Sequence, residues 1–116
     1  MKKAYEPERA EKLVPLLISI SREIRERGHA IQVLEGKSKK RKGKGDPVDP
    51  ATEARLATER RELRLALREL ARLGCVLDEL HPFRILIPGK AGDLLGGYQW
   101  ELGDETVRPV AIDSLT

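Results

Sequence analysis

Apolar residues recur every three or four positions over two long segments, which lie on either side of a run of basic residues. The first segment extends from Glu8 to about Leu34, and the second extends from Pro50 to Leu73. This spacing is typical of amphipathic helices that each have one face to bury. Two helices of similar length joined by a loop favour an antiparallel helical hairpin. Any fold of this chain must therefore bury a pair of helix faces.

Two prolines and a glycine are expected to divide the first helix. Pro7 suits its first turn, where the missing N–H donor is not needed. Pro15 lies inside the apolar pattern and predicts a bend over residues 11–15, because a proline ring clashes with the preceding helical turn. Gly28 lowers the helix propensity by about 1 kcal/mol relative to Ala. Residues 29–34 are therefore expected to form a separate turn.

The run between the helices, Lys37–Gly45, contains only Lys, Arg, Gly and one Ser. Such a segment offers nothing to a core and its charges repel one another, so residues 37–49 are predicted to form a flexible linker. Asp49 and Pro50 make a favourable N-cap and first-position pair for the second helix. Gly74 can end that helix in the left-handed conformation.

Beyond this glycine the apolar period changes from that of a helix to that of a strand. Strands are expected over three segments, Arg84–Ile87, Tyr98–Leu102 and Thr106–Ile112, and Cys75–Glu79 is a candidate for a fourth. The β region covers about residues 75–112. The sequence thus predicts an α+β fold in a single domain over residues 1–116, with an antiparallel two-helix hairpin packed on a small C-terminal antiparallel β-sheet.

Composition favours an intracellular protein. The chain of 116 residues can form one core, and with only 3% aromatic residues that core must be mostly aliphatic. Cys75 is the single cysteine, which excludes an intramolecular disulfide and suits a reducing compartment. The charged residues near the start leave no apolar signal-peptide region, and the uncharged run Leu13–Ser21 is too short to span a bilayer. We expect a cytoplasmic location and no membrane partner.

Basic charge is concentrated in one place. The net charge is +3, from 22 basic and 19 acidic residues. Six of the basic residues fall between Lys37 and Lys44, which leaves sixteen basic against nineteen acidic residues elsewhere. The rest of the chain is thus slightly acidic, and the basic run is a separate insert.

Two groups of cations are candidates for binding a polyanion, because clustered Lys and Arg bind phosphates by releasing condensed counterions. The basic run has no aromatic side chain for base stacking, so its binding would be weak and nonspecific. An arginine stripe on the second helix spans about 80° of a helical wheel. A solvated linker and a solvated helix face are the alternatives. The candidate residues are Lys37, Lys39, Lys40, Arg41, Lys42, Lys44, Arg61, Arg64, Arg68 and Arg72.

Four residues that can carry chemistry, Cys75, Asp78, Glu79 and His81, lie within seven positions. They permit a thiolate with a nearby imidazole, or a metal site. The alternative is a small buried cysteine and an extended loop histidine, and it is favoured because no third orienting group is present. We therefore expect no catalytic residue, no cofactor, no metal and no enzyme activity.

Three blocks of the sequence resemble those of a known family. Tyr5–Pro15 has an aromatic residue, an acidic turn, an alanine and a Leu-x-Pro helix. Glu69–Asp78 ends a helix with Leu-Gly-Cys before an acid, and Trp100–Asp104 combines tryptophan, glycine and an acid. These blocks are similar to those of domain of unknown function 2203, an uncharacterised prokaryotic family. Gln99 stands where many members have cysteine, so the resemblance supports the fold and implies neither a metal site nor an activity.

The first helix is apolar on more than one face. Val14, Leu16 and Ile18 lie outside the stripe that one antiparallel neighbour would cover. The leading hypothesis is therefore a non-enzymatic helical-hairpin module for interaction or oligomerisation, which self-associates, as a homodimer for example, or binds a protein partner. The alternative is a weak, nonspecific binder of nucleic acid or another polyanion that uses residues 37–45.

Overall fold

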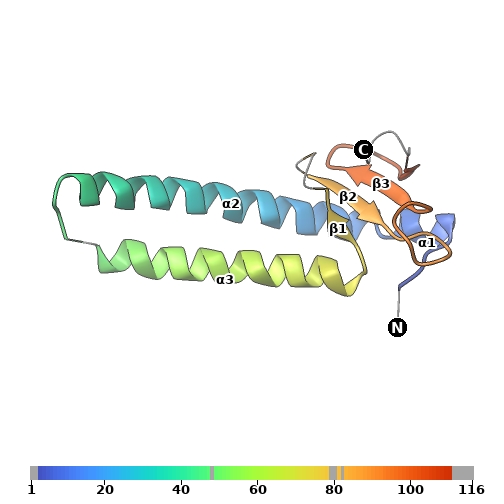
Figure 1. Cartoon of the computed structure of the whole chain (residues 1–116), viewed down its shortest axis with the longest axis horizontal. Helices are drawn as coiled ribbons and strands as arrows, with labels where there is room; N and C mark the ends of the chain where they lie inside the picture. The colour runs from blue at the N-terminus through green and yellow to red at the C-terminus, as the bar shows by residue number, and fades with distance from the viewer. Residues whose placement is uncertain (1–2, 48, 79–80, 82, 111–116) are drawn as a thin grey trace. The chain divides into compact units, whose positions relative to one another are not determined.

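The computed structural model describes residues 3–47, 49–78, 81 and 83–110. Helices come first along the chain and strands follow (Figure 1). The elements are α1 (Pro7–Lys12), α2 (Val14–Gly43), α3 (Pro50–Arg72), β1 (Val76–Leu77), β2 (Arg84–Ile87), β3 (Tyr98–Glu101) and β4 (Arg108–Pro109). This order confirms the predicted α+β fold.

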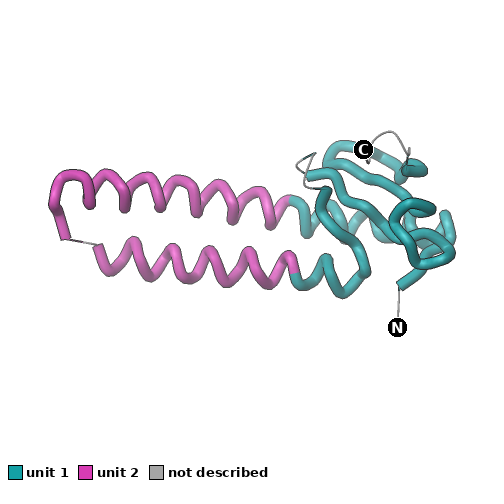
Figure 2. The backbone as a smooth tube through the Cα atoms, in the orientation of Figure 1, with its two compact units in different colours: residues 1–21, 68–116 teal, residues 22–67 magenta. Residues whose placement is uncertain are grey.

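The chain forms two compact units (Figure 2). The sheet unit comprises residues 1–21 and 68–116, and the hairpin unit comprises residues 22–67. Helices α2 and α3 each contribute residues to both units. The apolar pattern gives no sign of this division, because both helices keep their spacing of three and four across it. A single domain stays a prediction.

The sheet unit contains a four-stranded antiparallel meander in the order β1-β2-β3-β4. Ile85 of β2 pairs with Trp100 of β3, and Gln99 of β3 pairs with Arg108 of β4. The predicted strands are confirmed in place, although β4 covers only part of the expected range. The last two residues of that range, 111 and 112, lie outside the described residues.

Large apolar side chains fill the core of the sheet unit. Trp100, Ile85 and Ile87 from the sheet and Leu17 from α2 have no exposed surface. Tyr5 ties the N-terminal segment to this core, because its hydroxyl donates a hydrogen bond to the carbonyl oxygen of Leu73 (2.7 Å). The aliphatic core expected from the composition is thus completed by one tryptophan.

The bend predicted near Pro15 is present as a break between α1 and α2. Helix α1 ends at Lys12, and Leu13 separates it from α2, which begins at Val14. Pro15 therefore occupies the first turn of α2, where its missing N–H donor does no harm. This break sets the start of the long helix that runs into the hairpin unit.

The hairpin unit consists of the remaining parts of α2 and α3, which run antiparallel. Arg27 near its start contacts Glu59 of α3, while Ser38 further along contacts Glu53. Asp49 caps α3 as predicted: its carboxylate accepts hydrogen bonds from the Ala51 backbone N–H (3.2 Å) and the Thr52 hydroxyl (3.0 Å). Among the described residues of this unit, four apolar side chains are buried: Ile24, Leu34, Leu56 and Ala66.

Two predictions about α2 are wrong. Residues 29–34 are not a separate turn, and the basic run is helical as far as Gly43 rather than a linker. Lys and Arg are good helix formers, and cations in the last turn of a helix interact favourably with its dipole. Gly45 then ends the helix with a φ of 75° in a Schellman motif, in which the Asp46 N–H donates to the Arg41 carbonyl.

None of the helices within the described ranges combines the length and the apolar character that crossing a membrane requires.

Candidate polyanion interface

The basic run forms the end of α2 and the turn after it, at the tip of the hairpin unit (Figure 1). We call its six cations the basic tip: Lys37, Lys39, Lys40, Arg41, Lys42 and Lys44. All six side chains are exposed to solvent. Thirteen basic and eight acidic residues give the hairpin unit a net charge of +5. Without the six tip cations the unit would have seven basic and eight acidic residues, so the tip supplies all of its positive excess.

Helix geometry divides the basic tip between two faces. Ser38 marks the face toward α3, since its hydroxyl donates a hydrogen bond to Glu53 (3.4 Å). At 3.6 residues per turn, Lys37, Lys40 and Lys44 lie about 100° to 160° from Ser38 on the side of α2 opposite to Lys39, and we call this side the outer face. Lys44 follows the last residue of α2, but its backbone N–H still donates to the Lys40 carbonyl, as in a further helical turn (3.3 Å). These three lysines form an outer stripe one turn apart.

The other tip cations lie closer to α3, where acidic side chains already have partners. Lys39 and Lys42 line a groove between the helices. In this groove Glu35 forms an ion pair with Arg60 (3.0 Å), and Glu53 accepts the hydrogen bond from Ser38. Within the described part of the chain, no ion pair involves any of the six tip cations. Their charge is therefore available to a partner.

Asp49, at the start of α3, is also committed to a structural role. Hydrogen bonds from the Thr52 hydroxyl and the Ala51 backbone lower the pKa of its carboxyl, and the charge of Arg41 lowers it further. The carboxylate thus stays ionised as a helix cap and offsets only part of the charge of one tip cation.

The arginine stripe is exposed along α3, as the helical wheel predicts. Arg61 and Arg64 belong to the hairpin unit, and Arg68 and Arg72 belong to the sheet unit. Among the residues that the structure describes, none of the four forms an ion pair. Only the first two add to the charge of the unit that carries the basic tip. Polyanion binding by the stripe stays a prediction.

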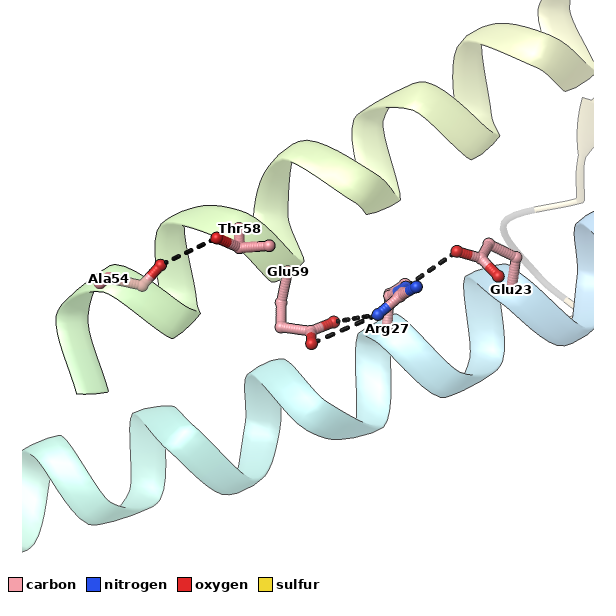
Figure 3. A network of polar contacts seen from close by, with 5 residues as sticks. All are labelled: Glu23, Arg27, Ala54, Thr58 and Glu59. Carbon is pink, nitrogen blue, oxygen red and sulfur yellow. Dashed lines mark hydrogen bonds and ion pairs between the residues drawn. The ribbon is translucent and has the colours of Figure 1, made fainter. Parts of the chain in front are cut away.

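The sequence analysis did not predict an ion-pair network between α2 and α3 in the hairpin unit (Figure 3). Arg27 Nε donates to Glu23 Oε1 (2.8 Å), and Arg27 Nη1 reaches both carboxylate oxygens of Glu59 on α3 (3.1 and 3.3 Å). These hydrogen bonds raise the pKa of Arg27, and the one to Glu23 has a larger effect than those to Glu59. Arg27 occupies a position of the first helix where the apolar spacing predicts an apolar residue. This charged residue on the buried face was the one sign in the sequence of a polar contact there.

Cys75 and His81 differ in their exposure to solvent. Cys75 is 2% exposed, and burial raises the pKa of its thiol to about 12. A thiol with this pKa is protonated at neutral pH, whereas a nucleophile or metal ligand must be a thiolate. His81 is exposed, and Glu79 is outside the described residues. Asp78 is buried, and its Oδ2 lies 3.8 Å from Nη1 of Arg84. Over the described ranges, no cluster of three or more His, Cys, Asp or Glu side chains could hold a metal ion.

Comparison with known proteins gives a family match. The model of a family described as "Uncharacterized conserved protein (DUF2203)" matches residues 3–110. Searches of curated proteins and of solved structures found no match.

Proposed function

Since that match covers most of the chain, the protein belongs to the DUF2203 family of uncharacterized conserved proteins, and we propose a function from the geometry of its own residues. We propose that it is a non-enzymatic binding module whose helical hairpin attaches to polyanions through the basic tip.

The observation that carries this proposal is the helical conformation of the basic run. A flexible run of lysines loses backbone entropy when it is ordered on a partner, at about 1–2 kcal/mol for each residue fixed. A run that is already helical avoids most of that loss, so its charges bind at a smaller entropic penalty. The outer stripe of Lys37, Lys40 and Lys44 then offers three cations along one face.

The chemistry of the tip points to phosphates in a sequence-independent way. Residues 37–44 include no aromatic side chain on which a base could stack, and no Asn or Gln that could read a base edge. Residues 37–44 also include no apolar side chain, so this helical end has no apolar face to insert into a lipid bilayer. Nucleic acid is therefore the polyanion to test first.

The proposal predicts how steeply the affinity for duplex DNA falls as the salt concentration rises. Each phosphate that a cation neutralises on duplex DNA contributes about −0.9 to the slope of log K against log salt concentration. Six tip cations in contact would give a slope of about −5, and losing the three lysines of the outer stripe would remove roughly half of it.

We would measure binding to a labelled short DNA duplex by fluorescence anisotropy between about 50 and 200 mM salt. The test variant is Lys37→Gln with Lys40→Gln and Lys44→Gln. The matched control is Lys12→Gln with Arg22→Gln and Arg25→Gln, which removes the same charge from other exposed positions without ion pairs among the described residues. The test variant should lose affinity and salt slope, and the control should lose much less. Equal losses, or no binding by the unaltered protein at low salt, would reject the basic tip.

Self-association of the hairpin unit is a second candidate function, favoured by its exposed apolar side chains. Val33, Leu65 and Leu67 are 45%, 47% and 38% exposed. The sequence analysis based this hypothesis on three apolar residues of the first helix that one neighbouring helix would leave uncovered. Two of them do not support it, because Val14 is buried and Ile18 is half-buried, while Leu16 is exposed.

Sedimentation velocity over a range of protein concentrations tests this candidate. Leu65→Gln should shift the protein toward monomer, whereas Leu95→Gln, at an exposed leucine of the sheet unit, should not. A protein that is monomeric at every concentration would contradict self-association.

A cytoplasmic location forms part of the proposal. Cys75 is a free, buried thiol, which a reducing compartment preserves. Cell fractionation tests the location, and recovery of the protein outside the cytoplasm would contradict it.

A further inference from the structure

A cavity of about 300 Å³ lies within the sheet unit, far along the chain from the basic tip. Its wall comes from the N-terminal segment, the last turn of α3 and the connection between β2 and β3. Ala71, Pro88 and Leu94 give it an apolar surface. This volume is at the lower end of the range of sites that bind small molecules, about 300–1,000 Å³.

Glycine at position 74 keeps this cavity open. Gly74 has a φ of 78°, which side chains rarely adopt. A Cβ atom added there would stand 2.8 Å from the Cβ of Lys3 and 3.4 Å from the Cγ of Pro88, two other residues of the wall. The missing side chain therefore leaves space between the N-terminal segment and the end of α3. Gly92, also with a positive φ, lines the cavity from the β2–β3 connection.

Both charged residues of the wall are cations. Lys3 and Arg72 line the cavity, and no acidic side chain does. Neither forms an ion pair with any residue that the structure describes. Asp93 is next to two wall residues in sequence, but its carboxylate accepts a hydrogen bond from the Gly96 N–H (3.2 Å). The two cations therefore give the cavity an uncompensated positive charge.

The end of helix α3 works against this charge, because the C-terminus of a helix carries a partial negative charge of about half an electron. Several backbone carbonyl groups at this helix end, however, already accept hydrogen bonds. The carbonyl of Leu70 accepts from the Cys75 N–H, that of Ala71 from the Gly74 N–H, and that of Leu73 from the Tyr5 hydroxyl. Two full positive charges outweigh what remains of this dipole.

We propose that this cavity binds a small organic anion, in which a carboxylate or phosphate group carries a compact apolar part. The guanidinium of Arg72 can hold the oxyanion by two hydrogen bonds and the ammonium of Lys3 adds a second charge. The apolar part would contact Ala71, Pro88 and Leu94. The proposal is independent of the hairpin tip, because every residue of the wall belongs to the sheet unit.

Phenyl phosphate is a suitable probe, since it combines a phosphate with one compact ring. We would titrate it into the full chain labelled with ¹⁵N and follow the backbone amide resonances. Saturable shifts are expected at Gly74, Gly92 and Leu94. Inorganic phosphate, which lacks the apolar part, should bind several-fold more weakly.

Arg72→Gln and Lys3→Gln should each weaken binding of phenyl phosphate about threefold to tenfold. Arg68→Gln is the matched control, because Arg68 is also an exposed arginine, one turn earlier on α3, and is not part of the wall. These positions are exposed, so the variants should fold normally. Shifts confined to residues 37–44, no saturable shift at the wall, or an equal loss with Arg68→Gln would overturn the proposal.

Discussion

In the sheet unit the most deeply buried side chains are large and mostly apolar, whereas the seam of the hairpin unit includes an ion pair. Trp100, Leu17 and Ile85 have no exposed surface, while Arg27 and Glu59 meet between α2 and α3 with side chains that are 33% and 14% exposed. Apolar burial is non-directional and depends little on salt. Ion pairs at partly exposed sites are weakened by salt. The sheet unit should therefore be the stable part of the molecule, and the hairpin unit the part that responds to its ionic surroundings.

This contrast agrees with the two binding proposals. The proposed site at the basic tip would act by charge, and it belongs to the unit that charge helps to hold together. The cavity lined by Lys3 and Arg72 has a partly apolar wall, and it belongs to the unit that contains more of the buried apolar side chains. A polyanion would thus bind to the unit that we expect to be less stable, and a small ligand to the unit that we expect to be more stable.

Trp100→Ala should produce the largest effect. Removing a fully buried tryptophan leaves a cavity in the core of the sheet unit and should lower the free energy of unfolding by about 3–5 kcal/mol. It also removes the hydrogen bond from the indole Nε1 to the Asp104 carbonyl (3.1 Å). Urea unfolding followed by amide exchange in β2 and β3 measures the change.

Trp100→Phe is the control, because it keeps an aromatic ring in the core and should cost less than the alanine variant. If the amides of β2 and β3 exchanged as slowly in the alanine variant as in the unaltered protein, burial of apolar side chains would not be what stabilises the sheet unit.

The sequence predicted the sheet unit more fully than the hairpin unit, for physical reasons. Strand positions and the left-handed Gly74 follow from local alternation and from the special backbone freedom of glycine. The basic run was assigned to a linker because like charges repel. Its Lys and Arg residues are nevertheless good helix formers, and α2 ends at Gly43, six residues beyond Lys37, before the left-handed Gly45.

The candidate sites depend on contacts between distant residues, which local patterns do not specify. Lys3 and Arg72 come together only because the N-terminal segment folds against the end of α3. The basic tip was recognisable from composition alone, but its outer stripe requires knowing that the segment is helical. The pairing of Arg27 with Glu59 requires the register of the two helices.

Glu59→Gln should have an intermediate effect, confined to the hairpin unit. The substitution leaves Arg27 with Glu23 as its ionised partner and removes the charged link to α3. We expect several-fold faster amide exchange in the middle of α2 and α3 with little change in the sheet unit, and a smaller difference at high salt. Glu35→Gln is the matched control, because its ion pair with Arg60 is nearly half exposed and should contribute less. Equal effects of the two variants would show that the Arg27 network is not the stronger link.

The smallest expected effect is a pH dependence at the start of α3. The hydrogen bonds to the Asp49 carboxylate lower its pKa in the folded protein, so ionised Asp49 stabilises the helix. This contribution is complete above the ordinary pKa of about 4, and it is lost as the pH falls through the lowered value in the folded protein. Asp49→Asn keeps an acceptor oxygen for the cap and should flatten the pH dependence of amide exchange in the first turn of α3, whereas Asp49→Ala should speed that exchange at every pH. An unchanged pH profile in the asparagine variant would mean that another group, and not the cap, titrates there.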